Sequence, residues 1–287
     1  MQVSLNELSQ VKGIGKKTIN RIREYKLADE GYISEYDKSL HLDRNSVNQG
    51  DCLELMNGIP DKSVDMILAD LPYGTTACSW DSIIPLDKLW LQYERIIKDN
   101  GAIVLTASQP FTTKLINSNI KLYKYSWVWN KIIGSGTLLA KKQPLRAVED
   151  ICVFYKHQPT YNPQMRERDK NKLRPLAKSN SSEIYGNNDG VVEERKENKK
   201  FPINIIDINS RSKELNSKYK QHPTQKPVAL FEYLIKTYTN EGDLVLDNVA
   251  GSGTTGVACQ NTDRDYILIE QEEEYINVIK DRLAGDE

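Results

Sequence analysis

The sequence contains few of the residues that build disulfide scaffolds and metal sites. Only four of its 287 residues are cysteines, at positions 52, 78, 152 and 259, and none belongs to a Cys-x-x-Cys pair. This spacing argues against a disulfide framework and a zinc ribbon, and it is typical of a protein from a reducing cytosol. The chain also has just three histidines, so we expect no metal site.

Long apolar runs are missing as well. No stretch approaches the ~18 apolar residues that a membrane-spanning helix requires, and the first ten residues lack the charged-then-apolar pattern of a secretory signal. We therefore expect no membrane segment and a cytoplasmic protein. Hydrophobic residues make up 39% of the chain and charged residues 28%, an ordinary balance for one large globular domain or two smaller ones.

The net charge of −1 hides two basic segments on an acidic body. Residues 1–26 carry six Lys and Arg against two Glu, and residues 156–220 carry fifteen Lys and Arg against nine Asp and Glu. Basic segments of this kind indicate a polyanionic partner that is contacted at defined places. Two solvated loops with a chance excess of Lys and Arg would have the same composition.

The first basic segment has apolar residues at spacings that fit two short helices, with Gly13 and Gly15 framing a tight turn between them. It resembles a helix-hairpin-helix element, a family in which the turn offers backbone N–H groups to a phosphate. The resemblance implies contacts to the DNA backbone at Gly13, Gly15, Lys16 and Lys17. The alternative is a plain helical extension.

Short apolar strands alternate with helical stretches along most of the remaining chain. We predict strands near residues 32–33 and at 46–48, 64–69, 102–107, 125–129, 151–155, 243–247 and 266–270. We predict helices at residues 86–98, 111–120, 228–238, 254–260 and 272–283. This alternation predicts an α/β fold with a doubly wound, mostly parallel sheet that is covered on both faces. The pattern stops between residues 156 and 220, which indicates an irregular insertion at the rim.

A glycine-rich turn follows the strand at 243–247 and opens the next helix. Its string Gly251-Ser-Gly-Thr-Thr-Gly256, with Glu270 closing the following strand, matches the dinucleotide fingerprint. The pattern suits any adenosine-bearing cofactor, because glycines admit a close backbone approach and a carboxylate binds ribose hydroxyls. Asp247 argues against NAD, since a carboxylate four residues before the turn would repel a pyrophosphate but attract an ammonium or sulfonium.

Two further strings lie where ligands are expected. Asp70-Leu-Pro72-Tyr73 directly follows a buried strand, at the carboxyl end where open parallel sheets place ligands. His222-Pro-Thr-Gln-Lys226-Pro227 leads into the helix at 228–238, and Pro227 suits the start of a helix. Taken singly, the first string would fit an ordinary strand-to-turn junction and the second a plain helix start.

The three strings in this order resemble the DNA amino-methyltransferases of the N6-adenine and N4-cytosine type. These enzymes use S-adenosyl-L-methionine to methylate an exocyclic amino group, and the order with the catalytic string first is similar to their β-type, circularly permuted class. The resemblance implies the Rossmann-like methyltransferase fold and three units, which are the catalytic half of the methyltransferase domain (45–155), a target-recognition insertion (156–220) and the cofactor-binding half (221–287). The helix-hairpin-helix-like element for the DNA backbone (1–26) precedes them as a fourth unit.

The same resemblance implies a role for each matched position. Asp70, Pro72 and Tyr73 match the catalytic tetrapeptide. The positions that match the cofactor site are Asp51, Cys52, Asp70, His222, Thr224, Lys226, Asp247, Ala250, Gly251, Ser252, Gly253, Thr254 and Glu270. Within this set, Asp247, the glycine turn and Lys226 would flank the methionine part, Glu270 would bind the ribose hydroxyls and Asp51 would contact the adenine. A helix N-cap is the alternative role for Asp51.

The implied chemistry needs hydrogen-bond acceptors at the target amino group. Its lone pair is delocalised into the base, and the Asp70 carboxylate and the Pro72 carbonyl would each accept one N–H, which localises the lone pair and stabilises the developing positive charge. The base must flip out of the duplex to be reached, and Tyr73 would stack on it. Leu71 replaces the proline that is usual in adenine enzymes, and Asn248-Val249 replaces the frequent Pro-Phe of the cofactor loop.

Together these inferences predict a site-specific, adenine-specific DNA methyltransferase that acts on double-stranded DNA in a bacterial or phage-infected cell. An initial Asp in the tetrapeptide favours adenine, and a cytosine-N4 enzyme is the first alternative. The second is a non-enzymatic DNA-binding module that uses the basic segments alone. RNA and protein-glutamine methyltransferases fit less well, because they usually carry the cofactor loop first. A homodimer and a cognate restriction endonuclease are partners that the resemblance allows.

Overall fold

The computed structural model describes residues 35–74, 82–167, 199–210 and 225–285. In these ranges the main sheet has eight strands in the order β1-β10-β9-β2-β3-β5-β4-β8, and β6 and β7 form a separate pair. The strands are β1 (Ser46–Gln49), β2 (Val64–Ala69), β3 (Ile97–Ala107), β4 (Tyr123–Ser135), β5 (Arg146–Phe154), β6 (Arg166–Glu167), β7 (Lys199–Lys200), β8 (Ile205–Asp207), β9 (Leu244–Asp247) and β10 (Asp265–Glu270). The predicted elements near 32–33 and at 1–26 lie outside the described residues.

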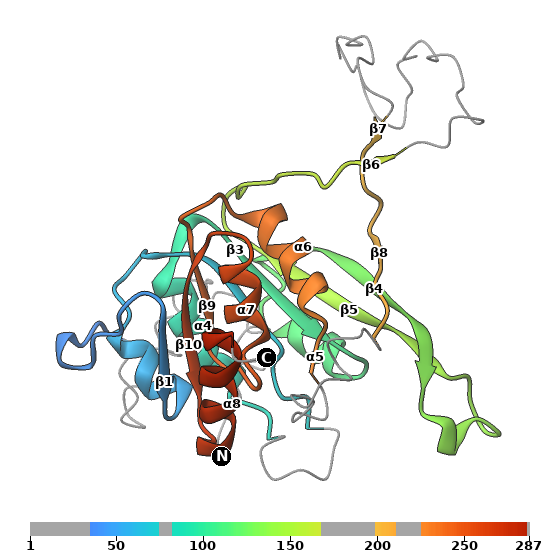
Figure 1. The fold of residues 1–287 in the computed structure, drawn as a ribbon, viewed down its shortest axis with the longest axis horizontal. Helices are drawn as coiled ribbons and strands as arrows, with labels where there is room; N and C mark the ends of the chain where they lie inside the picture. The colour runs from blue at the N-terminus through green and yellow to red at the C-terminus, as the bar shows by residue number, and fades with distance from the viewer. Residues whose placement is uncertain (1–34, 75–81, 168–198, 211–224, 286–287) are drawn as a thin grey trace, which may run out of the picture.

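Helices cover both faces of this sheet (Figure 1). The α-helices are α3 (Cys52–Leu55), α4 (Leu86–Ile96), α5 (Phe111–Ser118), α6 (Val228–Tyr238), α7 (Thr254–Gln260) and α8 (Glu273–Ala284). Short 3₁₀ turns lie at η1 (Lys38–Leu40), η2 (Met56–Gly58) and η3 (Thr137–Leu139). Helices α4 and α5 pack into one hydrophobic cluster, and α6, α7 and α8 pack into a second cluster on the other face.

The central strands are apolar on both sides because both faces are covered. In β2, Ile67 packs into the cluster with α4, whereas Met66 and Leu68 pack into the cluster with α6. All three side chains are fully buried. This packing explains why β2 is a continuous apolar run rather than an alternating one.

The predicted α/β fold with a mostly parallel sheet is confirmed. Strands β1, β10, β9, β2 and β3 run parallel, and β5 is antiparallel to both β3 and β4. Helices α6 and α7 have the predicted bounds. Helix α4 ends at Ile96, before the predicted end at residue 98, because β3 already begins at Ile97. The apolar run at 102–107 predicted a later start for this strand. In the described part of the chain, no helix is long and apolar enough to cross a bilayer.

The segment 156–220 contributes more to the sheet than its composition indicated. Strand β8 pairs in parallel with β4 at the sheet edge, and Ile206 within it is 4% exposed. A strand of three residues is too short to give a periodic pattern in the sequence, so the sequence did not predict this edge strand.

The strand order creates a crevice at the carboxyl ends of the parallel strands. After β9 the chain crosses through α7 to β10 on one side, and after β2 it crosses through α4 to β3 on the other. The two connections therefore leave the neighbouring strands β9 and β2 in opposite directions along the sheet. Parallel sheets bind their ligands at such a switch point, outside the carboxyl ends of the strands.

Candidate active site

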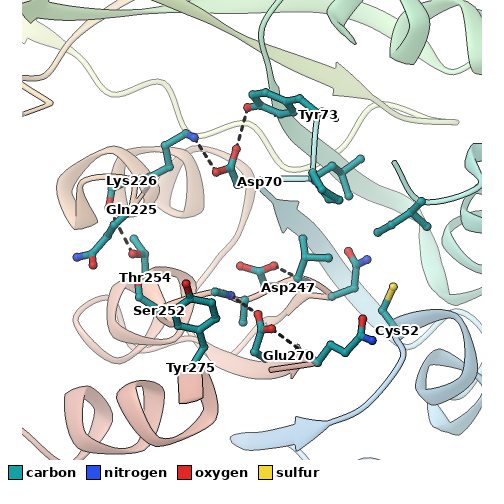
Figure 2. A pocket seen from close by; sticks show the side chains of 18 of the residues that line it. Cys52, Asp70, Tyr73, Gln225, Lys226, Asp247, Ser252, Thr254, Glu270 and Tyr275 are labelled. Carbon is teal, nitrogen blue, oxygen red and sulfur yellow. Dashed lines mark hydrogen bonds and ion pairs between the residues drawn. The ribbon is translucent and has the colours of Figure 1, made fainter. Parts of the chain in front are cut away.

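A cavity of about 560 Å³ lies at this switch point. Its walls include residues at or directly after the carboxyl ends of β1, β2, β9 and β10, so it gathers Asp51, Asp70, Asp247 and Glu270 from distant parts of the chain. The volume falls in the range of ligand pockets in proteins. Figure 2 shows the labelled side chains around this space.

Asp247 is held at the end of β9 by the turn that follows it. One carboxylate oxygen accepts the Val249 N–H at 3.1 Å and the other accepts the Thr255 hydroxyl. The side chain is 3% exposed, and this burial raises its pKa to about 7. Because burial makes this carboxylate costly to ionise alone, a cationic ligand bound beside it would stabilise its ionised form.

The glycines of the turn are required by the backbone. Gly251 and Gly253 have φ angles of 52° and 78°, in the left-handed region that side chains rarely adopt. Gly253 is also the N-cap of α7, and a Cβ there would meet Ile279 at 3.0 Å. Gly251 therefore lines the cavity without a side chain, whereas the missing Cβ of Gly253 makes room for α8.

Glu270 closes β10 and accepts three backbone N–H groups. They come from Gly251 at 2.7 Å, Gln271 at 2.8 Å and Glu272 at 2.9 Å. Burial nevertheless raises the pKa of this carboxyl, which is 9% exposed, above its usual value. These bonds orient the carboxylate at the cavity wall, where it can accept the hydroxyl groups of a ligand.

Asp51 follows β1 and caps α3. Its carboxylate accepts the N–H groups of Leu53 at 2.7 Å and Glu54 at 3.3 Å, so the capping role is present in the structure. Asp51 also lines the cavity, and its contact with a cofactor stays a prediction. The neighbouring Cys52 has its pKa raised to about 11 by burial, which keeps the thiol protonated at neutral pH.

Asp70, directly after β2, is held by three partners. Its Oδ2 lies 2.6 Å from Nζ of Lys226, and its Oδ1 accepts the Tyr73 hydroxyl at 2.8 Å and the Thr106 hydroxyl. Figure 2 shows the lysine and the tyrosine reaching this carboxylate from different elements. Pro72, the third residue of the predicted catalytic set, lines the same cavity.

Lys226 stands between two carboxylates. Its Nζ lies 3.4 Å from Oε2 of Glu149 on β5, in addition to its contact with Asp70, and the residue is 8% exposed. Burial alone would lower the pKa of Lys226, but the two carboxylates raise it above its usual value. The other oxygen of Glu149 pairs with Lys131 of β4 at 3.0 Å.

Tyr73 is packed by its ring and anchored by its hydroxyl. The ring stacks on Phe111 with centroids 5.2 Å apart and an angle of 24° between the ring planes. Burial raises the pKa of the phenol well above its usual value, so the hydroxyl stays a donor. Sequence reasoning considered only the ring of this residue, and the hydroxyl contact with Asp70 is a finding of the structure.

Three buried polar atoms in the described residues have no hydrogen-bond partner. They are Oε2 of Glu149, which has only its longer ion pair with Lys226, Oε1 of Gln225 and Nδ2 of Asn248. All three residues line the cavity. Buried polar groups in proteins are normally paired, so these atoms indicate a wall that is completed by a polar ligand.

The structure brings most of the predicted site residues to one cavity. Those that line it are Asp51, Cys52, Asp70, Pro72, Tyr73, Lys226, Asp247, Ala250, Gly251, Ser252, Thr254 and Glu270. Gly253 lies in the same turn. His222 and Thr224 of the cofactor set, and Gly13, Gly15, Lys16 and Lys17 of the DNA-binding set, lie outside the described residues. Thr106, Lys131 and Glu149 were not predicted, because no recognised string contains them.

Comparisons with known proteins agree on a single family. The family model described as DNA methylase matches residues 64–281. The chain is 30% identical over 257 residues to the DNA adenine methyltransferase YhdJ of Escherichia coli (strain K12), covering 83% of this chain and 82% of the relative. It is 28% identical over 255 residues to the type II methyltransferase M.HpaI of Haemophilus parainfluenzae, covering 82% and 72%.

Solved structures share the fold. The M1.HpyAVI–SAM complex aligns with a TM-score of 0.55 and 24% identity, over 83% of this chain and 99% of the other. The cytosine-N4-specific PvuII DNA methyltransferase aligns with a TM-score of 0.58 and 20% identity, over 84% and 87%.

Proposed function

The chain belongs to the DNA methylase family, and we propose that it transfers a methyl group from S-adenosyl-L-methionine to the 6-amino group of adenine in double-stranded DNA. The observation that carries this proposal is the arrangement of one cavity. Asp70 and Tyr73 lie at the end of β2, and Asp247 and Glu270 lie at the ends of β9 and β10. The target adenine, held beside Asp70, and S-adenosyl-L-methionine, held beside Asp247 and Glu270, would therefore meet at the switch point.

The described residues fit this cofactor. S-adenosyl-L-methionine supplies an electrophilic methyl on a sulfonium and also carries an ammonium and a ribose diol. Asp247, with its pKa raised to about 7 by burial, would be stabilised as an anion by the cationic groups. Glu270 is oriented by three N–H donors to accept the ribose hydroxyls. Gly251, which lines the cavity without a side chain, would let the methionine part lie close to the backbone.

Asp70 is prepared to accept one hydrogen from the target amino group. An ionised carboxylate has about four acceptor sites, and Lys226, Tyr73 and Thr106 occupy three of them. The remaining site would take one N–H of the adenine, and the Pro72 carbonyl would take the other. These acceptors localise the nitrogen lone pair, and the negative charge of Asp70 stabilises the positive charge that develops on nitrogen. As the nitrogen–methyl bond forms, the methyl–sulfur bond would break and S-adenosylhomocysteine would leave, and the methylated nitrogen would then lose one proton.

Adenine is favoured over cytosine by two observations. The tetrapeptide begins with Asp70, and the 30%-identical relative YhdJ is named a DNA adenine methyltransferase. The cytosine-N4-specific PvuII enzyme is 20% identical, a likeness that concerns the fold.

The test is the chemical identity of the product. The chain should be expressed in a bacterial host that lacks DNA methylation, and the host DNA digested and separated into nucleosides. We expect N6-methyladenine with the natural chain and none with Asp70→Ala. N4-methylcytosine would overturn the choice of base, and unmodified DNA would overturn the proposed activity.

We also propose where the enzyme works and what accompanies it. Several relatives are named type II methyltransferases, which supports a place in a restriction–modification system, with a cognate endonuclease, in the cytoplasm. A homodimer is proposed on the family resemblance alone, and sedimentation of the purified protein tests it.

Sequence recognition is proposed for the basic insertion at residues 156–220, between the catalytic half (45–155) and the cofactor-binding half (221–287). Its charge of +6 suits DNA. Exchanging it for the matching region of a relative with a known site should change the methylated sequence and keep the methylated atom. An active chimera that keeps the original site would assign recognition to another part of the chain.

A further inference from the structure

The hairpin between β4 and β5 exposes an apolar tip. Every residue from 135 to 146 is exposed, and Leu138 within η3 is fully so, at 100%. Leu139 and Leu145 beside it are 44% and 43% exposed. Figure 1 shows this hairpin projecting past the body of the sheet. A soluble protein rarely holds several large apolar side chains on a projecting loop unless the loop contacts a partner.

The same loop is basic. It carries Lys141, Lys142 and Arg146, and no acidic residue occurs between positions 131 and 148. This combination suits a polyanion with an apolar interior, which is the character of a DNA duplex. Two copies of this loop would not pair with each other, because both carry positive charge.

The loop begins at the mouth of the cavity. Ser135 and Arg146 pair across the base of the hairpin, and both line the cavity that contains Asp70. A base that enters this cavity would therefore leave its duplex next to the loop.

The stem of the hairpin is also irregular at this point. Asn130 pairs with Val148 and Ser135 with Arg146, so four residues of β4 face a single residue of β5. Ile132 in this bulge has a φ of 65°, and its N–H is held by the Asn130 side chain at 3.0 Å. A β-branched residue rarely adopts this conformation, and such strain gathers at functional sites, as bulges do. Such a bulge bends the strand and so changes the direction in which the loop leaves the sheet.

We propose that this loop enters the duplex beside the target base pair, with Leu138 as the wedge that fills the gap left by the flipped adenine. Lys141 and Lys142 hold the adjacent phosphates. Leucine is among the side chains that proteins insert between base steps, and such a wedge offsets the stacking that the flipped base loses. This inference rests on the proposed function, because it requires a base to be taken out of a duplex.

The test compares two substrates. The methylation rate of Leu138→Ser should be measured on a matched duplex and on the same duplex with the target adenine in a mismatch, which is already easier to flip. We expect a loss of at least about tenfold on the matched duplex and of less than about twofold on the mismatched one. The fluorescence of 2-aminopurine at the target position should fall in parallel, since it reports the unstacked base.

The matched control is Ile120→Ser. Ile120 is 63% exposed and precedes β4 at the end opposite the hairpin, so both of its rates should equal those of the natural chain. Thermal unfolding should be unchanged in both variants, because both side chains are exposed.

Two outcomes would overturn the wedge. The first is an equal rate for Leu138→Ser and the natural chain, and the second is an equal loss on both substrates. If the equal loss is accompanied by dissociation of a dimer, the loop is an interface between copies. If the natural chain methylates neither DNA, the proposed function fails instead, so the two failures are distinguishable.

Discussion

Lys226 and Asp70 are 156 residues apart in the chain, and their charged atoms lie 2.6 Å apart in the cavity. The family resemblance implied that Lys226 flanks the methionine part of the cofactor. The structure adds a direct contact with the proposed catalytic carboxylate and, through Glu149, a link to β5. Asp70 is therefore connected through the buried Lys226 to a second carboxylate on a different strand.

Asp70→Asn tests the carboxylate itself. The amide keeps the size of the side chain but removes the charge that would stabilise the developing ammonium. We expect methyl transfer to fall by roughly 10²–10³-fold, the usual cost of one such electrostatic group. Single-turnover transfer of a labelled methyl group gives the rate. Binding of S-adenosylhomocysteine should stay within about threefold, and a near-natural rate would remove Asp70 from the chemistry.

Glu149→Gln tests the network behind Asp70. Loss of this charge leaves Lys226 less compensated, so the site becomes more positive where a positive charge must develop. We expect a roughly tenfold slower methyl transfer with little change in cofactor affinity. The control is Asp99→Asn, which removes an acid that pairs with Lys62 and Lys156 at the exposed surface. Equal effects of the two changes would reduce Glu149 to a structural ion pair.

Tyr73→Phe isolates the hydroxyl that bonds Asp70. The hydroxyl orients the Asp70 carboxylate, so we expect its removal to slow methyl transfer by about tenfold through misalignment of this acceptor. Tyr73→Ala should lose more, because it also removes the ring that stacks on Phe111. Comparison of the two rates, with cofactor binding measured for both, separates the ring from the hydroxyl. Full activity of the Phe variant would mean that the ring alone matters.

Asp247 predicts a pH dependence of stability. Its pKa rises from 3.8 in the unfolded chain to about 7 in the folded protein because of burial, so the folded state holds the proton more tightly. This carboxyl therefore lowers the free energy of unfolding as the pH rises from about 4 to 7, by at most ~4 kcal/mol. Asp247→Asn should lose this dependence, which thermal unfolding of the cofactor-free proteins at pH 5 and pH 8 would measure.

The same pKa has the opposite consequence for binding. A cationic ligand prefers the ionised form, so affinity for S-adenosyl-L-methionine should rise between pH 6 and pH 8 in the natural chain and stay flatter in Asp247→Asn. A wild-type affinity that is constant over this range would contradict the assignment of Asp247 to the cationic part of the cofactor.

Deletion of residues 1–26 tests the helix-hairpin-helix-like element, which lies outside the described residues. The segment carries a charge of +4 and a glycine turn suited to phosphate. DNA binding should weaken at low salt, and the salt slope should fall by roughly one unit for each phosphate that the truncated protein no longer neutralises. The methylated site and cofactor affinity should be unchanged, once the truncated protein is shown to be folded. A changed site would mean that the element reads sequence.

The sequence by itself determined the longer helices, the central strands and the location of the ligand site at the carboxyl ends of the strands, but neither the short helix α3 nor the end of α4. Helices α6 and α7 have the predicted bounds, because an amphipathic or apolar period is a local property of the chain. The glycine turn could also be predicted from the sequence, since the left-handed backbone at Gly251 and Gly253 restricts the residue type at these positions. The carboxyl-terminal positions of Asp70, Asp247 and Glu270 followed from the parallel sheet.

Only the tertiary structure decided which side chains meet and what charge they hold. Glu149 and Thr106 reach Lys226 and Asp70 from β5 and β3, and no motif in the sequence of either strand distinguishes these two residues. A period records which face of a strand is buried, and it contains no information about the partner across a cavity. The pKa of Asp247 likewise depends on burial by segments distant in sequence. Pairing and desolvation arise from packing in three dimensions, so they were set by the fold and not by any local pattern.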